Sequence, residues 1–400
     1  PCGSPRHRRW IRDRTVIYLD NNATTMIDPR VADVLREAFA ASYANPASQH
    51  SLGRQARSRI DQSLEVIGDC VGTRVDQPGG PRMILTSGGT ESNNLALRGL
   101  ARGAAIVSRI EHPSVLETAE SLATSGRTIH WLDVHSSGLV DLQALDDLLH
   151  RHSDEVSLVS IMSANNETGI VQPVQQAAEI CRRARVPLHV DATQSIGKQA
   201  VNLSSLGASA VTFTAHKFHG PVGIGALWLD AGIKIRPIFR GGGQQLETRP
   251  GTESVALTMA MAEAVRLATG EQPDAAEQMK TLRDRLESGL RRRHPELVVH
   301  GDAAERLPGT SCVSFVGADR QSVLMALDIA GIACSSGSAC SSGSSPPSHV
   351  LLAMNVSEAV VASAIRFGVS KFSTIDEIDQ CIESISRVYN KLRRNISVDN

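Results

Sequence analysis

The sequence predicts an α/β protein: a large domain built on a mostly parallel sheet of seven strands, with a smaller α+β domain after it. Seven short apolar runs alternate with helical patterns between residues 83 and 229, as expected of repeated βαβ units. Polar and glycine-rich motifs follow several of these runs, at the strand ends where such sheets bind ligands. Beyond residue 270 amphipathic helices dominate, which indicates a second domain.

The strands of the large domain are predicted from the apolar runs. These runs are Met83–Thr86, Ala104–Val107, Thr128–Leu132, Val156–Met162, Pro187–Val190, Ala210–Phe213 and Gly225–Leu229. Helices are predicted between several of them, for instance over Ser92–Arg102 and Gln172–Ala184, where the pattern changes from strand-like to helical.

The second domain is predicted to contain two long amphipathic helices. The first opens at Glu271, and its buried stripe is Met279, Leu282, Leu286 and Leu290. The last begins with a capping box from Thr374 to Glu377, and its buried stripe is Ile378, Ile382, Ile385 and Tyr389. We therefore expect residues 26–270 to form the large domain, and residues 1–25 together with 271–400 to form the small one.

Composition limits the function. The 400 residues carry 41 basic and 42 acidic side chains and only 3% aromatics, which predicts binding neither to nucleic acid nor to an anionic membrane. No run reaches the roughly 18 apolar residues of a membrane span, and the basic N-terminal stretch lacks the apolar core of a secretory signal. Seven cysteines without a Cys-x-x-Cys pair favour reduced thiols, a cytoplasmic location and no metal site; an organelle is the alternative location.

Lys217 gives the first indication of chemistry. An apolar strand runs into His216-Lys217, and a Gly/Pro loop follows at once. A lysine held at a strand end is suited to form a Schiff base with an aldehyde cofactor, although a surface lysine would give the same pattern. Cys340 lies in a Ser/Gly-rich stretch too small and polar to pack, so it is predicted to be a mobile nucleophile. Cys334, which ends Ile-Ala-Cys, is predicted to be core.

Other motifs follow predicted strands, and each has a structural alternative. Ser87–Glu91 opens a helix, so its glycines and the Thr90 hydroxyl could bind an anion or form a plain capped turn. Asp191 could pair with a protonated pyridine nitrogen or cap the next helix. His112 could stack on a flat ring or be structural. Asn166 could donate to a phenolate oxygen or form an Asx turn.

Two further segments allow a binding role. The loop from Gly241 to Thr252 is rich in backbone donors and could serve a phosphate or a subunit contact, or be an ordinary surface loop. Arg366 follows an apolar segment. A guanidinium held by a strand can bind a carboxylate through two N–H groups, and a surface salt bridge is the alternative.

Together these residues resemble the cysteine desulfurases, a group of class V aminotransferases with the type I fold of pyridoxal-phosphate enzymes. The motifs that carry the resemblance are Tyr18–Thr25, Asn45–His50, Thr86–Asn94, Asn165–Gly169, His189–Gln194, His216-Lys217 and Ser335–Cys340. They run nearly the full length of the chain, and their joint occurrence makes a chance match untenable.

The resemblance implies pyridoxal 5'-phosphate as cofactor and L-cysteine as substrate. Lys217 would hold the cofactor covalently, Asp191 would pair with the pyridine nitrogen, and His112 would stack on the ring and assist proton transfer. The phenolate oxygen would be contacted by Asn166 and Gln194. The residues expected to hold the phosphate are Gly89, Thr90, Thr214, His216 and, from the second subunit of a homodimer, Thr252. The substrate carboxylate would be bound by Arg366, with Asn22 or Asn166.

The resemblance also implies a reaction. Lys217 would remove the Cα proton, and Cys340, as thiolate, would take the sulfur as a persulfide and pass it to an acceptor such as an iron–sulfur scaffold protein. Selenocysteine lyase is the nearest alternative; an aminotransferase and a non-catalytic relative are more distant ones. The chain departs from the family at Thr214, often a serine, in the Gly241 loop, and in its C-terminal tail. These departures leave dimer detail and the identity of the acceptor open.

Overall fold

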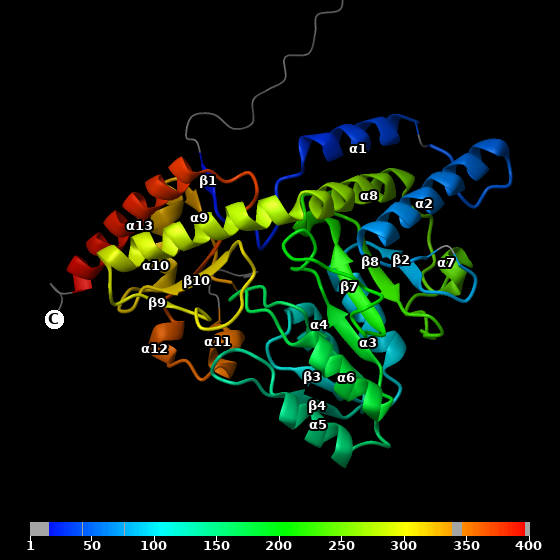
Figure 1. Cartoon of the computed structure of the whole chain (residues 1–400), viewed down its shortest axis with the longest axis horizontal. Helices are drawn as coiled ribbons and strands as arrows, with labels where there is room; N and C mark the ends of the chain where they lie inside the picture. Colours follow the sequence, from blue (N-terminus) through cyan, green and yellow to red (C-terminus); the bar gives the residue numbers. More distant parts are fainter. Residues whose placement is uncertain (1–15, 42, 76, 338–345, 397–400) are drawn as a thin grey trace, which may run out of the picture.

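The computed structural model describes residues 16–41, 43–75, 77–337 and 346–396. Within them the chain forms two bodies side by side (Figure 1). The larger one contains a seven-stranded sheet in the order β2-β8-β7-β6-β5-β3-β4. Its strands are β2 (Arg82–Thr86), β3 (Ala104–Ser108), β4 (Ile129–Leu132), β5 (Val156–Met162), β6 (Leu188–Asp191), β7 (Ala210–Thr214) and β8 (Gly225–Leu229). The predicted α/β class and its seven strands are confirmed.

One strand of this sheet runs against the others. Neighbours from β4 to β7 pair in parallel, whereas β8 is antiparallel to both β7 and β2. Successive strand residues project to opposite faces. Leu227 and Leu229 join the hydrophobic cluster under α3 and α4, while Ala226 and Trp228 join the large cluster on the other face.

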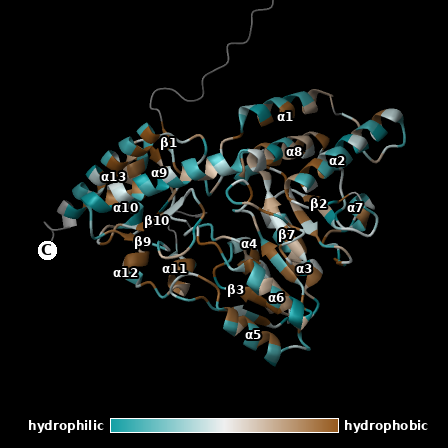
Figure 2. Ribbon diagram, viewed as in Figure 1, coloured by the Kyte–Doolittle hydropathy of each residue, from teal (hydrophilic) through white to brown (hydrophobic). Residues whose placement is uncertain are grey.

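Helices cover both faces of the large sheet. One face carries α3 (Gly89–Leu100) and α4 (Pro113–Thr124). The larger cluster on the other face takes residues from the remaining helices of this body. These are α1 (Pro29–Ala41), α2 (Ser51–Cys70), α5 (Leu142–Arg151), α6 (Val174–Ala184) and α8 (Val255–Gly270). Two short turns complete this body, the 3₁₀ turn Ala215–Lys217 and α7 (Gln244–Glu247). Figure 2 shows hydrophobic residues along the central strands and mixed hydrophilic and hydrophobic residues along the outer helices.

The second body has its own core. A three-stranded antiparallel sheet in the order β12-β10-β9 packs against three helices, and β1 pairs in parallel with β11. Its strands are β1 (Ile17–Tyr18), β9 (Val298–Val299), β10 (Thr310–Ser314), β11 (Ile332–Ala333) and β12 (Ala364–Gly368). Its helices are α9 (Gln272–Arg293), α10 (Arg320–Ile329), α11 (His349–Ala353), α12 (Glu358–Val361) and α13 (Ile375–Ile396). Figure 1 shows α9 running from the end of α8 into this body.

The long helices of the second body have the predicted ends and stripes. Proline suits the first turn of α9, where an N–H has no partner within the helix. Asp274 in that turn and three arginines in the last turn suit the positive and negative ends of the helix dipole. The capping box is present, because the Thr374 amide donates to Glu377 Oε2 and the Glu377 amide donates to Thr374 Oγ1. All predicted stripe residues of α9 and α13 are buried.

The two bodies share core residues. Ile17 and Leu19, from the N-terminal segment, belong to the cluster of the second body. Val350 and Met354, from α11, belong to the large cluster of the first. The boundary predicted near residue 270 therefore stays a prediction. Within the described residues, no helix is long and apolar enough to cross a membrane.

We expect Leu286→Ala to lower the free energy of unfolding by about 2 to 5 kcal/mol, because Leu286 is fully buried in the second core and the truncation leaves a cavity. The measurement is urea unfolding followed by circular dichroism. Met325→Ala, on an exposed position of α10, is the control and should change stability by no more than about 0.5 kcal/mol. Equal losses in both variants would contradict this view of the second core.

Candidate active site

A cavity of about 230 Å³ opens at the carboxyl ends of the parallel strands. Most of its wall comes from the ends of strands and the segments that follow them: the start of α3, the start of α4, the loop after β5, the turn after β6 and the 3₁₀ turn after β7. Ala23 of the N-terminal segment completes the lining. The predicted site residues that line it are Gly89, Thr90, His112, Asn166, Asp191, Gln194, Thr214, His216 and Lys217. These residues are far apart in the sequence, and the parallel sheet brings them to one edge.

Lys217 points inward rather than into solvent. Its Nζ donates to the carbonyl oxygens of Asn22 at 2.5 Å and Ala23 at 2.8 Å. The pKa of its amine is lowered to about 8, chiefly by burial and then by the charge of Arg366, while Asp191 and Asp20 act in the opposite direction. With this pKa about one molecule in ten carries the neutral amine at pH 7, and the neutral amine is the form that acts as nucleophile or base.

Asp191 and His112 are joined through a residue that the sequence did not single out. Asn93 Nδ2 donates to Asp191 Oδ2 at 2.7 Å and to Ser114 Oγ at 2.8 Å. The Ser114 amide in turn donates to His112 Nδ1 at 3.1 Å, so a neutral His112 ring carries its proton on Nε2. Burial lowers the pKa of His112, which favours this neutral form. Asn93 lies four residues after Gly89 on α3. This spacing puts both residues on one face of the helix, and it is the feature of the sequence that could have indicated Asn93.

The start of α3 fits an anionic group. The backbone at Gly88 has a φ of 156°, a conformation that favours glycine. A Cβ placed on Gly89 would come within 3.3 Å of Thr193 Oγ1. That hydroxyl is buried without a hydrogen-bond partner among the described residues. The first N–H groups of a helix lack partners within it and attract anions. A phosphate at this point would satisfy these donors.

His216 and Thr214 border the same part of the cavity. The pKa of His216 is lowered to about 4, chiefly by burial and then by the charges of Lys217 and Lys198. His216 Nδ1 lies 3.2 Å from Thr24 Oγ1. Thr214 Oγ1 donates to the Ile224 carbonyl and so keeps its lone pairs for an incoming donor. A neutral His216 can therefore contribute a hydrogen bond without adding a charge.

Arg366 lies beside the cavity rather than in its wall. It is on β12 and 4% exposed, so the surface-pair alternative is wrong. One arm donates to the Asn166 carbonyl at 2.8 Å, and the other donates to Asp20 Oδ1 and Ser335 Oγ. Its Nε is buried without a partner among the described residues. Arg366 thus connects the second body to the loop after β5 and retains one unused donor.

Asn22 and Thr252 do not line the cavity either. The Asn22 side chain donates to Thr310 Oγ1 at 2.8 Å, and its backbone carbonyl is the acceptor for Lys217. Thr252 is exposed on the loop after α7. Just before that loop, in α7, Gln245 reaches back to the edge strand β2, where its side-chain amide bonds both the amide and the carbonyl of Leu85.

The cysteines within the described residues are free thiols with raised pKa values. Burial raises the pKa of Cys181, Cys312 and Cys381 to about 12, and it raises the pKa of Cys334 strongly as well. Protonated thiols are poor nucleophiles. Cys334 packs partly buried against the second core, as predicted. The predicted nucleophile, Cys340, lies outside the described residues.

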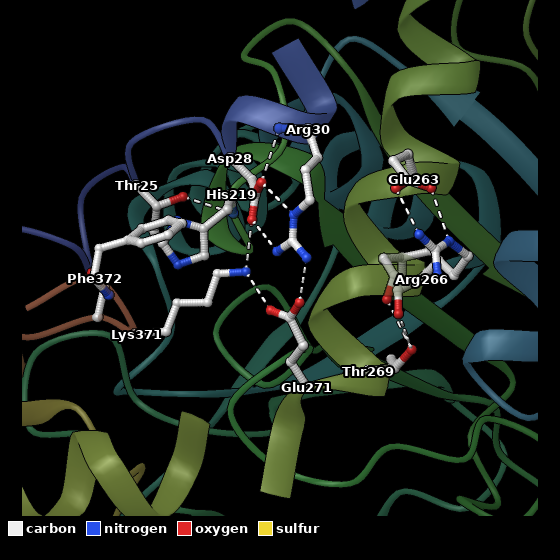
Figure 3. Close-up of polar contacts among 12 residues, drawn as sticks. Thr25, Asp28, Arg30, His219, Glu263, Arg266, Thr269, Glu271, Lys371 and Phe372 are labelled. Carbon is white, nitrogen blue, oxygen red and sulfur yellow. Dashed lines mark hydrogen bonds and ion pairs between the residues drawn. The ribbon is translucent and has the colours of Figure 1, made fainter. Parts of the chain in front are cut away.

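A network of four charges joins the two bodies next to this site. Asp28, with 2% of its side chain exposed, accepts bonds from Arg30 and Lys371, and Glu271 accepts bonds from the same two residues. Figure 3 shows these residues converging from α1, the α8–α9 junction and the segment before α13. The bonds from Arg30 and Lys371 hold the pKa of Asp28 well below its usual range.

The same contact region reaches the lysine segment. The Asp28 amide donates to the His219 carbonyl, and the His219 ring packs edge-on against Phe372, with centroids 4.9 Å apart. Thr25, also drawn in Figure 3, donates to the His216 carbonyl and accepts from the His219 amide. The network therefore fixes the segment that supplies the carbonyl partners of Lys217.

Among the described residues, one trio outside the cavity has the side chains of a metal site. The ligand atoms of His130, His152 and Glu155 lie within 4.8 Å of one another. However, the two imidazole rings are stacked, with centroids 4.1 Å apart and 29° between their planes. Ring nitrogens bind metals in the plane of the ring, so stacked rings do not converge on one ion without rotating.

Comparison with known proteins places this arrangement in a family. The family model described as Aminotransferase class-V matches residues 17–381. A cysteine desulfurase of Cereibacter sphaeroides is 39% identical over 383 residues, which cover 94% of this chain and 96% of that protein. A NifS-like protein from Rickettsia africae has a TM-score of 0.85 at 31% identity, over 94% of this chain and 99% of that chain. The structure of SspA in complex with cysteine has a TM-score of 0.77 at 29% identity, over 90% and 100%.

The chain belongs to the aminotransferase class-V family, because that family model matches residues 17–381. The mostly parallel sheet, with a lysine and an aspartate at its strand ends, agrees with this class. Within that family it is a member of the cysteine desulfurases.

We expect Asp28→Asn to lower the free energy of unfolding by roughly 2 to 3 kcal/mol, because the change leaves Lys371, whose side chain is 12% exposed, with one acidic partner instead of two. Urea unfolding measures the loss. Asp379→Asn removes one partner of the exposed pair with Arg285 and should have no measurable effect. Equal results for the two variants would show that the network contributes nothing beyond a surface ion pair.

Proposed function

We propose that this chain converts L-cysteine to L-alanine with pyridoxal 5'-phosphate held in the cavity, and that the sulfur passes to Cys340 as a persulfide. The observation that carries the proposal is the placement of Lys217 and Asp191 on one cavity beside the anion-binding start of α3. Family membership supports it, as does the neighbour SspA, which was solved with cysteine. Pyridoxal phosphate, when bound, accepts the electrons released when the Cα proton leaves.

The residues of this chain have separate roles in that reaction. Asp191 is placed to hold a proton on the pyridine nitrogen, and Asn93 fixes the orientation of its carboxylate. The backbone amides at the start of α3, including those of Gly89 and Thr90, and the unpartnered hydroxyl of Thr193 would hold the phosphate; the Thr214 hydroxyl, which donates to the Ile224 carbonyl, would first have to turn from it. His112, which lines the cavity and in its neutral form carries its proton on Nε2, would stack on the ring. These contacts hold the reacting carbon at a fixed position next to Lys217.

Lys217 acts as the base. Its lowered pKa lets the neutral amine accept the Cα proton and later return a proton to carbon. Arg366 has a buried, unused Nε and binds the substrate carboxylate. Asn166, whose carbonyl holds Arg366, and Gln194 contact the ring oxygen. Asn22 is the further substrate contact proposed.

The sulfur step balances without an added oxidant. The Cys340 thiolate attacks the substrate sulfur, the new S–S bond forms, and the Cβ–S bond breaks with its electron pair staying on carbon. Protonation of that carbon gives alanine. One thiol and one cysteine thus yield one persulfide and one alanine, and a carrier such as an iron–sulfur scaffold protein then accepts the sulfur.

We propose a homodimer as the working form. Thr252 is exposed and outside its own cavity, so it is free to reach the phosphate of a second subunit. Leu246, in the same loop, is a large hydrophobic residue with 74% exposure, which suits a surface covered by a partner. The cytoplasmic location stays a prediction from cysteine usage.

We expect Cys340→Ser to lower both alanine and persulfide formation at least about 100-fold, because it removes the attacking thiolate. Cys334→Ser is the control and should retain activity, since burial keeps the Cys334 thiol protonated. Alanine and persulfide are measured after mixing the purified holoenzyme with cysteine. Unchanged alanine in Cys340→Ser would remove Cys340 from the mechanism. No alanine from the wild type, despite bound cofactor, would overturn the desulfurase proposal and make selenocysteine the next substrate to test.

A second prediction concerns the pH dependence of Lys217. Only the neutral amine attacks an aldehyde, so labelling of the cofactor-free protein by pyridoxal phosphate, trapped with borohydride, should rise with pH and level off above about pH 8 at Lys217. Exposed lysines keep gaining reactivity up to about pH 10, and Lys280, exposed on α9, is the control within the same sample. Peptide mass spectrometry quantifies both sites. Parallel curves for the two lysines would contradict the lowered pKa.

A further inference from the structure

A second lysine stands behind the cavity, in the turn after β6. Lys198 Nζ donates to Gln194 Oε1 at 2.6 Å, and the proposed reaction gives it no role. The turn that carries Lys198 packs closely against α8. Gly197 in this turn has a φ of +75°, and a Cβ at Gly197 would lie 2.9 Å from the Cβ of Ala268. The Lys198 carbonyl also accepts a bond from Gln272 at the start of α9. The amine is therefore aimed at Gln194 by its backbone.

The bond from Lys198 and the bond to the Asn22 carbonyl together determine which way the Gln194 amide faces. A primary amide has one acceptor oxygen and two N–H donors. Lys198 occupies the oxygen, and one N–H donates to the Asn22 carbonyl at 2.9 Å. The other N–H is left for the cavity, whose wall Gln194 helps to form. The Asn22 carbonyl is also the acceptor for Lys217 Nζ, so Lys198, Gln194, Asn22 and Lys217 form one continuous chain of contacts.

The surroundings of Lys198 are cationic. Its pKa is lowered to about 7, chiefly by burial and then by the charges of Lys217 and Arg366. In the other direction, the charge of Lys198 lowers the pKa values of His216 and His219. A lysine in such a place costs stability when it is charged. Both the charged and the neutral amine can donate to Gln194, so the contact does not require the charge.

We propose that Lys198 is a positioning residue that holds the Gln194 amide with an N–H, rather than its carbonyl oxygen, towards the ring oxygen of the bound cofactor. The inference rests on the proposed function, since it assigns the occupant of the cavity to pyridoxal phosphate. A donor at the ring oxygen stabilises the anionic form of that oxygen. Loss of Lys198 removes the donor that holds the side-chain oxygen of Gln194. The amide can then turn over, so that this oxygen faces the ring oxygen of the cofactor.

The test is the pH titration of the visible absorbance of the cofactor bound to Lys217. In Lys198→Met the midpoint should rise by about 0.5 to 1 pH unit, the effect of losing one hydrogen bond to a charged oxygen. Lys198→Arg keeps a donor and should restore the wild-type midpoint. Lys280→Met, which changes an exposed lysine, should leave the midpoint unchanged. Lys198→Ser, too short to reach Gln194, repeats the test if Lys198→Met does not fold.

A double-mutant cycle separates positioning from general damage. If Lys198 acts through Gln194, then Lys198→Met on top of Gln194→Leu should move the midpoint no further. Additive shifts, or an unchanged midpoint in Lys198→Met, would overturn the inference while leaving the proposed function intact. A wild-type protein that develops no visible absorbance with pyridoxal phosphate would overturn both.

Discussion

The contact between residues 22–28 and residues 216–219 is the constraint on which the rest of the site depends. Thr25 and Asp28 bond the backbone of His216 and His219, and the Asn22 carbonyl accepts from Lys217. His219 has a φ of 66°, a strained value for a residue with a side chain. The bonds made by its amide, carbonyl and ring offset that strain. Because the N-terminal segment also pairs with the second body, the same contact sets the position of that body relative to the reactive lysine.

The cavity is surrounded by more positive than negative side chains. Three cationic side chains, Lys198, Lys217 and Arg366, lie near one cavity, and Asp20 and Asp191 are the carboxylates that act on Lys217. Excess positive charge in a partly buried place is unfavourable for an isolated protein. It becomes favourable when a phosphate and an amino-acid carboxylate enter. The lowered pKa of Lys217 is thus a property of the whole arrangement rather than of one neighbour.

Burial makes the described thiols unreactive, whereas it makes the Lys217 amine more reactive. The buried cysteines are surrounded by apolar side chains that keep them protonated and unreactive. A sulfur acceptor needs exposure and a stabilised thiolate, and the small, polar composition of the segment around Cys340 predicts that exposure. The ends of this segment are well placed: Ser335 bonds Arg366, and Ser348 bonds Glu167 in the loop after β5.

The sequence by itself determined the fold class, the strands and the long helices, because apolar periodicity of two or of about 3.6 residues reports directly on burial. It also gave Lys217, Asp191, His112 and the glycine turn, since each follows a strand and parallel strands end at one edge. Only the tertiary structure decided that Asn93 links Asp191 to His112, that Arg366 is buried, and that Lys198 meets Gln194. Those contacts join residues through side-chain directions and a second body, and neither is encoded in local spacing.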